Sequence, residues 1–516
     1  MAGPRHAARL TRGVDLLRVG LPTLVAVVVY LVGINVLGAW LGRGQRDAGE
    51  YFLGSHAMPW WAVMVSIVAT ETSALTFLSV PGDAYRSGFA FLQLTFGYLI
   101  GRVAVSFILL PGYFAGKLTT AYALLERRFG VAVRRFASLT FMITRVMAAS
   151  VRLAVPAIPI SLILGVPVWV AILVLAAGTA VYTYVGGIKA VIWIDLIQVI
   201  VYLSGAVLAL VFLAGAIPGG LGGVLGGGGA RLFDLSPELS KPYTLWAGLL
   251  GGTFLTMASH GADQLIVQRL LTCPGLPQAR RALIGSGVVV ILQFALFLTI
   301  GVGLSTFFTG RPIDSSGLDP NAFRTSDEIF PTFIVRHLPP LVSAYLVAGI
   351  FSAAMCSESA ALNSLASALA HDIVGPLVGR AVLEGRRGLW LGRLLTLFWT
   401  VVLAALSVGF SRMGQSEPGV QVALGLASVT AGGLLGAFLL GLIVRRAVQG
   451  DVLLAVATSA LAMFLLWLGA RGWIDFSLAR RIAWPWYSLI GSAIAVGVGW
   501  TSSVLRTAFK RPAAQR

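Results

Sequence analysis

The sequence predicts an all-α membrane protein with about 13 transmembrane helices. Of the 516 residues, 57% are hydrophobic and only 11% are charged. Apolar runs close to the ~20 residues that span ~30 Å of hydrocarbon recur along the chain. Polar or glycine residues interrupt two of these runs, which lie five runs apart, and this spacing indicates a 5+5 inverted-repeat core with two broken helices.

The predicted spans follow one another with short connections. They lie at 20–41, 60–85, 89–113, 136–164, 166–185, 190–217, 243–262, 282–308, 341–371, 390–411, 418–444, 452–470 and 484–505. We expect an N-terminal tail and first peripheral helix (1–50), a first five-helix repeat (51–217), a Gly-rich external loop (218–242), a second repeat (243–446), and two C-terminal helices with a basic tail (447–516). The run Gly219–Gly229 is expected to be a flexible linker, and residues 326–340 a short amphipathic outer helix.

The distribution of Lys and Arg predicts the orientation. An external N-terminus places 21 basic residues, Arg269 among them, in the cytoplasm and 14 outside, and leaves Arg102, Arg145 and Arg152 within spans. We therefore expect a multi-pass protein of the cell (inner) membrane with its N-terminus outside and its C-terminus cytoplasmic. The net charge of +18 reflects this orientation, so the expected partner is the lipid bilayer and not nucleic acid.

The second run carries hydroxyls and a carboxylate at mid-membrane depth, including Thr70, Glu71 and Thr72. Hydroxyls that bond back to the backbone favour a discontinuous helix whose freed carbonyls line a cavity. The break is expected within Ala69–Ser73. The stretch Leu249–Thr253, which contains two glycines, is expected to break the seventh run in the same way.

The run 341–371 combines transmembrane length with stripes of small and hydroxyl residues. One stripe contains Ala353, Cys356 and Ser357, and an overlapping one contains Cys356, Ser359 and Asn363. Such stripes face protein, water or an ion. This pattern alone is compatible with both a tightly packed helix interface and an ion site.

Charged residues within the spans are few, so pairing between them is expected. The basic members are Arg102, Arg145 and Arg152, and the acidic ones are Glu71, Asp195 and Glu358, with Asp263 near the inner end of a span. Purely structural ion pairs are an equal alternative to a functional network. The two cysteines, Cys273 and Cys356, provide no disulfide framework. The sequence has no metal-binding motif, and it has no catalytic nucleophile motif with a soluble domain around it. An enzyme is therefore not expected.

Seven segments in order resemble the sodium:solute symporter family, from about residue 50 to 505. They are ATETSALTFLSVPGDAY (69–85), LLERRFG (124–130), TRVMAASVRLAVPAIP (144–159), YVGGIKAVIWIDLIQ (184–198), HGADQLIVQRLLT (260–272), EIFPTF (328–333) and AGIFSAAMCSESAALNSL (348–365). The resemblance implies the inverted-repeat fold of the leucine transporter and sodium-coupled uptake of a small solute by alternating access.

The resemblance also implies the site residues. The main sodium site takes carbonyls of Ala69, Thr72 and Ala353 and the side chains of Cys356 and Ser357. A possible second ion site has Asp195 and Ser359, and the solute lies against Ser73, Thr76, Arg145 or Arg152, Ser259 and His260. Family members usually have Ser-Ser where this chain has Cys356-Ser357, and a thiol is a poor ligand for a hard cation. Glu71 and Glu358 are assigned to a charge network, with Glu358 as an arginine partner or a protonatable group.

The expected function is therefore a sodium-coupled symporter of a small organic solute, with sodium as coupling ion and no cofactor. An arginine beside the cavity would suit a carboxylate. Two alternatives remain open from the sequence: proton coupling on the same fold, suggested by Cys356, Glu71 and Glu358, and a solute sensor that does not transport.

Overall fold

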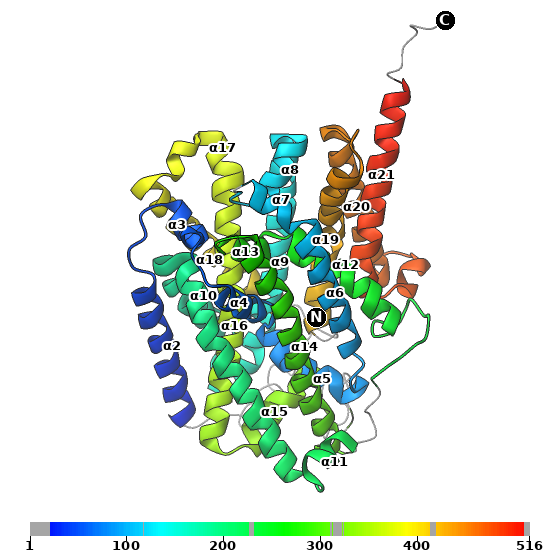
Figure 1. Ribbon diagram of the computed structural model, residues 1–516. Coiled ribbons are helices and arrows are strands. Elements are labelled where there is room, and N and C mark those ends of the chain that lie inside the picture. The colour runs from blue at the N-terminus through cyan, green and yellow to red at the C-terminus, as the bar shows by residue number, and fades with distance from the viewer. Residues whose placement is uncertain are drawn as a thin grey trace, which may run out of the picture.

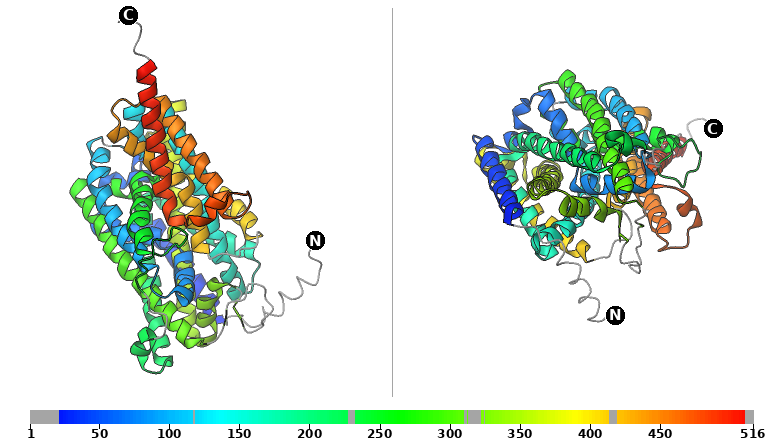
Figure 2. Two further views of the ribbon diagram at one scale, coloured as in Figure 1. Left: turned by 90° about the vertical axis from the view of Figure 1, so that its right-hand side faces the viewer. Right: turned by 90° about the horizontal axis from the view of Figure 1, so that it is seen from below.

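The computed structural model describes residues 21–509 except 117, 227–231, 310–311, 313–321, 324 and 413–418. The predicted N-terminal tail up to residue 20 and the end of the predicted basic C-terminal tail, from residue 510, lie outside these residues. The described part is built of helices, most of which run roughly parallel to one long axis (Figure 1). The peripheral helices stand at opposite edges, α2 (Leu21–Leu41) at one and α20 (Gln449–Ala470) with α21 (Tyr487–Phe509) at the other (Figures 1 and 2).

The predicted first repeat contains the helices from α3 to α10. Their bounds are α3 (Ala48–Leu53), α4 (Trp60–Glu71), α5 (Ala74–Ser87), α6 (Leu92–Ile108), α7 (Leu110–Ala115), α8 (Tyr122–Phe129), α9 (Val131–Leu164) and α10 (Val168–Ala216). The helix α4 ends at the predicted break, because Thr72 (φ −82°, ψ 84°) and Ser73 (φ −79°, ψ 167°) leave the helical conformation.

The predicted second repeat begins with three consecutive helical segments, in which an α-helical segment lies between two π-helical ones. They are η2 (Ala247–Gly251), α12 (Gly252–Met257) and η3 (Ala258–Ala262). They are followed by α13 (Gln264–Leu271), α14 (Leu276–Phe307), α15 (Ile329–His337), α16 (Pro340–Ala368), η5 (Leu369–Val374), α17 (Gly375–Val378), α18 (Gly385–Ser411) and α19 (Gly419–Ile443). The wide turns of η2, η3 and η5 are π-helical, a form that is frequent at functional sites.

The chain reverses within α10. Gly187 has a positive φ of 53°, and a Cβ added there would lie 2.4 Å from the carbonyl oxygen of Tyr51. Tyr182 and Ile194 both lie next to Gly38 of α2, although in a straight helix twelve residues would separate them by ~18 Å. The two halves of α10 are therefore the two predicted runs 166–185 and 190–217.

The second break does not lie at Leu249–Thr253, so that prediction is wrong. Backbone angles at Gly251 and Gly252 are helical, and the helix breaks at Asp263 (φ −103°, ψ 128°), whose side chain accepts a hydrogen bond from the Leu265 N–H. The glycines here serve packing. A Cβ on Gly97 of α6 would lie 2.0 Å from the Gly248 carbonyl oxygen, so the two backbones are in direct contact.

The Gly-rich run was expected to be a flexible linker, but Gly220–Gly226 forms the short helix α11. Val224 is fully buried and packs beside Gly303 of α14, which explains why this part of the run forms a helix. A short helix was predicted within 326–340, and α15 confirms it; Pro339 precedes the start of α16.

Within the described ranges, nine helices are long and apolar enough to cross a membrane, or ten if the bent pair α3 and α4 forms one span. The halves of the two broken helices are each too short to be counted, and α10 contains two predicted runs. The count of thirteen spans stays a prediction.

Candidate functional site

The break between α4 and α5 releases the two carbonyl groups that were predicted as ion ligands. In an uninterrupted helix the Ala69 oxygen would accept from the Ser73 N–H, which instead donates to Glu71 O at 3.1 Å. The Thr72 oxygen would accept from the Thr76 N–H, which instead donates to Ser73 Oγ at 3.4 Å. Both carbonyls therefore lack their usual helical donor, as a cation-binding segment requires.

The helix α16 packs against both α4 and α5 and presents the other predicted ion residues. Ser357 Oγ lies 3.4 Å from the Ala353 carbonyl oxygen, so a hydroxyl and a carbonyl lie together on one face. Cys356 is buried and its thiol donates to Gln198 Oε1 of α10 at 3.0 Å. The thiol already has a partner in α10, which agrees with its poor suitability for sodium.

The residues predicted for a second ion lie deeper in the protein. Asp195 Oδ2 accepts from Ser66 Oγ at 2.5 Å and lies 3.4 Å from Arg269 Nη2, while Oδ1 has no partner within the described residues. Ser359 Oγ donates to the Cys356 carbonyl. Arg269 was counted as a cytoplasmic residue, but it is fully buried because it neutralises Asp195. Arg269 therefore belongs to a buried ion pair and is not an exposed loop charge.

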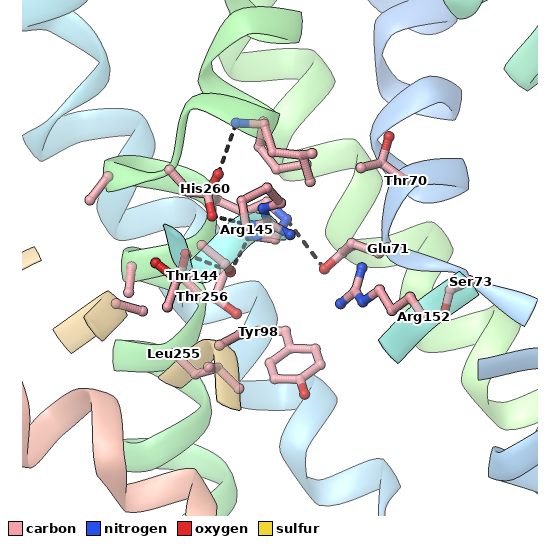
Figure 3. Close-up of a pocket in the computed structure, with 18 of the residues that line it drawn as sticks. Thr70, Glu71, Ser73, Tyr98, Thr144, Arg145, Arg152, Leu255, Thr256 and His260 are labelled. Carbon is pink, nitrogen blue, oxygen red and sulfur yellow. Dashed lines mark hydrogen bonds and ion pairs between the residues drawn. The ribbon is translucent and has the colours of Figure 1, made fainter. Parts of the chain in front are cut away.

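A cavity of about 120 Å³ lies beside the first break. All six predicted solute residues line it: Ser73, Thr76, Arg145, Arg152, Ser259 and His260. Glu71 lines it as well, whereas Glu358 does not. The walls contain residues of α4, α5, α6, α9, α12, η3, α13, α14 and α19, and Figure 3 shows part of this lining. The fold thus brings together residues that are up to 187 positions apart, from Ser73 to His260.

Glu71 belongs to a buried network at one wall. Its carboxylate forms an ion pair with Arg102 of α6, and Arg102 Nε donates to Ser286 Oγ at 3.2 Å. His260 Nε2 lies 3.2 Å from both Glu71 Oε1 and Arg102 Nη2, and its Nδ1 lies 2.9 Å from Ser259 Oγ. The expected pairing of Glu71 with an intramembrane arginine is confirmed, and its partner is Arg102.

The two arginines of α9 differ in their partners. Arg145 forms an ion pair with Asp263 at the second break. Arg152 has no ion pair within the described residues, and its buried Nε has no hydrogen-bond partner there. Figure 3 accordingly shows no dashed line at Arg152. Of the two arginines of α9 that line the cavity, Arg152 is therefore the one without an ion pair to a described residue.

Glu358 lies on α16 about 200° around the helix from Cys356, hence on the opposite face. It is buried, and its Oε1 has no partner in the described part of the chain. No ion pair joins it to a described arginine, which leaves the protonatable group, the other role expected of Glu358, as the prediction. Its neighbours one turn away, Ala354, Ala361 and Leu362, belong to the apolar core.

Several cavity residues were not found from the sequence. They are hydroxyl and aromatic residues, Tyr98, Thr144, Thr256, Phe294 and Thr430 among them. Thr430 of α19 donates to Thr144 of α9 at 2.9 Å, which closes one side of the cavity. Threonine and phenylalanine are common in membrane helices, so the sequence contained no signal that would separate these from lipid-facing residues.

The sequence was compared with protein families and with known proteins. The sequence model of the sodium:solute symporter family matches residues 51–458. The sodium/sialic acid symporter SiaT of Proteus mirabilis is 28% identical over 92% of this chain and 93% of its own length. The human sodium/iodide cotransporter is 28% identical over 86% of this chain and 69% of its own.

Solved structures agree. A substrate-bound, outward-open Na+-coupled sialic acid symporter superposes with a TM-score of 0.81 at 26% identity, over 94% of this chain and 98% of the other. The nucleobase-cation-symport-1 family transporter MHP1 has a TM-score of 0.57 at 14% identity, covering 90% and 95%, and shows the shared fold alone. Both are transporters of the leucine-transporter-like fold that the sequence predicted. With a family match over most of its length, the chain belongs to the sodium:solute symporter family and is a sodium-coupled symporter, not an enzyme.

Proposed function

We propose that the protein imports a small organic solute that carries a carboxylate, with the carboxylate bound by Arg152 in the cavity. The observation that carries this proposal is the contrast between the arginines. Arg102 and Arg145 are each in an ion pair, whereas Arg152 has none with any residue that the structure describes. An unpaired guanidinium inside a membrane is costly, and a planar two-oxygen partner satisfies it best.

The cavity lining fits a solute with polar groups beyond its carboxylate. Ser73, Thr76 and Thr256 supply hydroxyls, and Tyr98, Phe141 and Phe294 supply aromatic surface. Relatives named for sialic acid, iodide and monocarboxylates share the anionic character of their cargo. This chain has 26–28% identity to them, so we limit the proposal to the carboxylate class.

We infer that the main sodium ion is bound by the carbonyls of Ala69, Thr72 and Ala353 and by the Ser357 hydroxyl. The two freed carbonyls on α4 support this, since a hard cation needs several oxygen ligands. Cys356, predicted as a fifth ligand, contributes its backbone position and a hydrogen bond to Gln198. Asp195 and Ser359 remain the proposed second ion position, at which Asp195 Oδ1 is the available carboxylate oxygen.

We further propose that the N-terminus is outside and the C-terminus in the cytoplasm. The loop distribution of basic residues supports this orientation even after Arg269 is removed from the count. Single cysteines at Lys241 and Arg446, both exposed, provide the test. An impermeant thiol reagent should label the first in intact cells and the second only after the membrane is opened. The reverse pattern would mean that the opposite orientation is correct.

The test of function is uptake by the purified protein in sealed vesicles, with imposed sodium or proton gradients and a pooled panel of acids, sugars and neutral amino acids. We expect sodium-driven accumulation of one or more carboxylates. Uptake of an uncharged sugar that no carboxylate inhibits would refute the assignment to Arg152. Binding of a solute without uptake under either gradient would instead support the sensor alternative.

A further inference from the structure

A second hollow lies away from the solute cavity, on the outer surface of the helix bundle. It has a volume of about 780 Å³ and lies between the first half of α10 and α18. Its floor is made of small or buried side chains, Ala176, Ala180, Thr400 and Ala404. Its walls are large exposed apolar side chains, including Trp169, Leu173 and Val401. We call this feature the α10–α18 groove.

The two helices run antiparallel along the groove. At one end, the Tyr51 hydroxyl forms hydrogen bonds with the Thr183 carbonyl of α10 and with Thr396 Oγ1 of α18. At the same end, Arg393 of α18 lies over the Tyr184 ring of α10. The opposite ends of the two helices, Trp169 and Arg412, therefore lie together at the other end of the groove. From Trp169 to Val181 the groove follows α10 for ~18 Å, which is slightly more than half of the ~30 Å hydrocarbon thickness.

The chemistry of the groove selects its occupant. Both helices are apolar enough to cross a membrane, so hydrocarbon chains surround the groove. Thr400, a polar floor residue, already donates to Thr396 O at 2.9 Å. The charge at the groove is that of Arg412, which is exposed and has no ion pair within the described residues. Trp169 stands at the same end, where aromatic rings prefer the membrane interface.

We propose that the α10–α18 groove is a binding site for one anionic glycerophospholipid. An acyl chain lies on the alanine floor, and the phosphate of the headgroup binds Arg412. A chain of one leaflet has the length of the groove, and the guanidinium complements a phosphate in both charge and geometry. The occupant is a lipid and not a second copy of the protein, since apolar side chains line the groove, hydrocarbon surrounds it and the cation Arg412 lies at one end.

The site lies directly behind the predicted ion helix. Tyr182, next to the wall residue Val181, donates to the Met355 carbonyl of α16 at 3.2 Å. A bound acyl chain therefore presses on a helix whose inner face contacts the residue before Cys356. The first half of α10 therefore connects the groove to α16, the helix that carries Ala353 and Ser357.

The experiment uses the full-length protein in phosphatidylcholine nanodiscs that contain a trace of phosphatidylglycerol with a diazirine on its acyl chain. After illumination, mass spectrometry maps the labelled peptides. We expect the label to concentrate on residues 168–181 and 397–412. The variant Ala404→Trp fills the floor and should remove this labelling, whereas Ala457→Trp, at an exposed alanine of α20, should not.

The headgroup is tested with Arg412→Gln. We expect the preference for the phosphatidylglycerol probe over a phosphatidylcholine probe to fall about fivefold, the effect of one basic residue at an anionic lipid surface. Arg336→Gln, an exposed arginine of α15, serves as the control and should leave the preference unchanged. Ala404→Leu, a smaller change at the same place, replaces Ala404→Trp if that variant does not fold.

Three results would overturn the proposal. Labelling spread evenly over all lipid-facing helices would mean that the groove holds no particular lipid. Equal labelling by the two probes in the wild type would exclude the anionic headgroup. Loss of a dimer in Ala404→Trp, with lipid labelling unaffected, would assign the groove to a second copy of the chain.

Discussion

Arg102 is fully buried in α6 and forms an ion pair with Glu71 at the last residue of α4. The pair joins the broken helix to α6 at the position where the helical hydrogen bonds stop. Removing one partner leaves a buried charge without compensation, which costs about 3–5 kcal/mol, whereas removing both costs less. We therefore expect Glu71→Gln and Arg102→Met each to lower the melting temperature in detergent more than the double variant does.

The exposed pair Lys241–Glu238 is the control for this cycle. Since both its members are in water, its single and double variants should melt like the wild type. Additive losses for Glu71 and Arg102 would show that the contact seen between them does not stabilise the protein.

Arg152 should determine the affinity for the solute. The change Arg152→Lys keeps the charge and loses the two-pronged geometry, so binding should weaken by about 1–3 kcal/mol with little loss of folded protein. Arg145→Lys, which disturbs the ion pair with Asp263, should instead reduce the yield of folded protein. Solute binding by calorimetry and yield after purification separate the two effects. Unchanged affinity in Arg152→Lys would place the carboxylate elsewhere.

Ser357 and Cys356 should respond differently to truncation. Ser357→Ala removes a hydroxyl ligand and should raise the sodium concentration for half-maximal binding about tenfold or more. Cys356→Ala removes a thiol that bonds to Gln198, so the sodium midpoint should change little although the protein becomes less stable. A sodium titration of solute binding measures both, and equal losses would mean that position 356 binds the ion after all.

The second ion position can be tested through stoichiometry. Ser359→Ala should lower the number of sodium ions transported with each solute by one, if Asp195 and Ser359 bind an ion. Ser364→Ala loses the same kind of local hydrogen bond to a helix carbonyl, and it should leave the stoichiometry unchanged. Reversal potentials in vesicles measure the ratio. An unaltered ratio in Ser359→Ala would leave Asp195 with a structural role alone, neutralised by Arg269.

The thiol of Cys273 should react slowly at neutral pH. It is buried in the connection between α13 and α14, and burial raises its pKa to about 12. The thiolate is the reactive species, so at neutral pH the group stays protonated and maleimide labelling should be slow. The rate should rise only as the pH approaches that value. Rapid labelling of the wild type, compared with the exposed Lys241→Cys, would show that this connection opens.

Most of the fold could be predicted from the sequence, because the length and spacing of apolar runs are set by the bilayer. The first break was also predictable, since Glu71 and its hydroxyl neighbours have no place in a lipid-facing helix. The second break was placed ten residues too early. Glycine pairs such as Gly251-Gly252 allow either a break or a close helix contact, and only the position of Gly97 decides between them.

The site was predictable where a residue carried a charge or a matched motif. All six solute residues line one cavity. The partners were not predictable, because an ion pair such as Asp195–Arg269 depends on a three-dimensional approach of residues 74 positions apart. The absence of a partner for Arg152 could likewise be seen only after Arg102 and Arg145 had been assigned to theirs.

The contact between Gly97 and Gly248 limits how this protein can move. With no side chain between the two backbones, α6 and η2 cannot slide past each other without a collision, so they must travel as a single body. Bending is left to the two points where helical hydrogen bonds are interrupted, Thr72–Ser73 and Asp263. Since Glu71 and Asp263 form ion pairs with arginines at these same points, we expect the exchange of inward and outward access to depend on whether these two ion pairs stay closed.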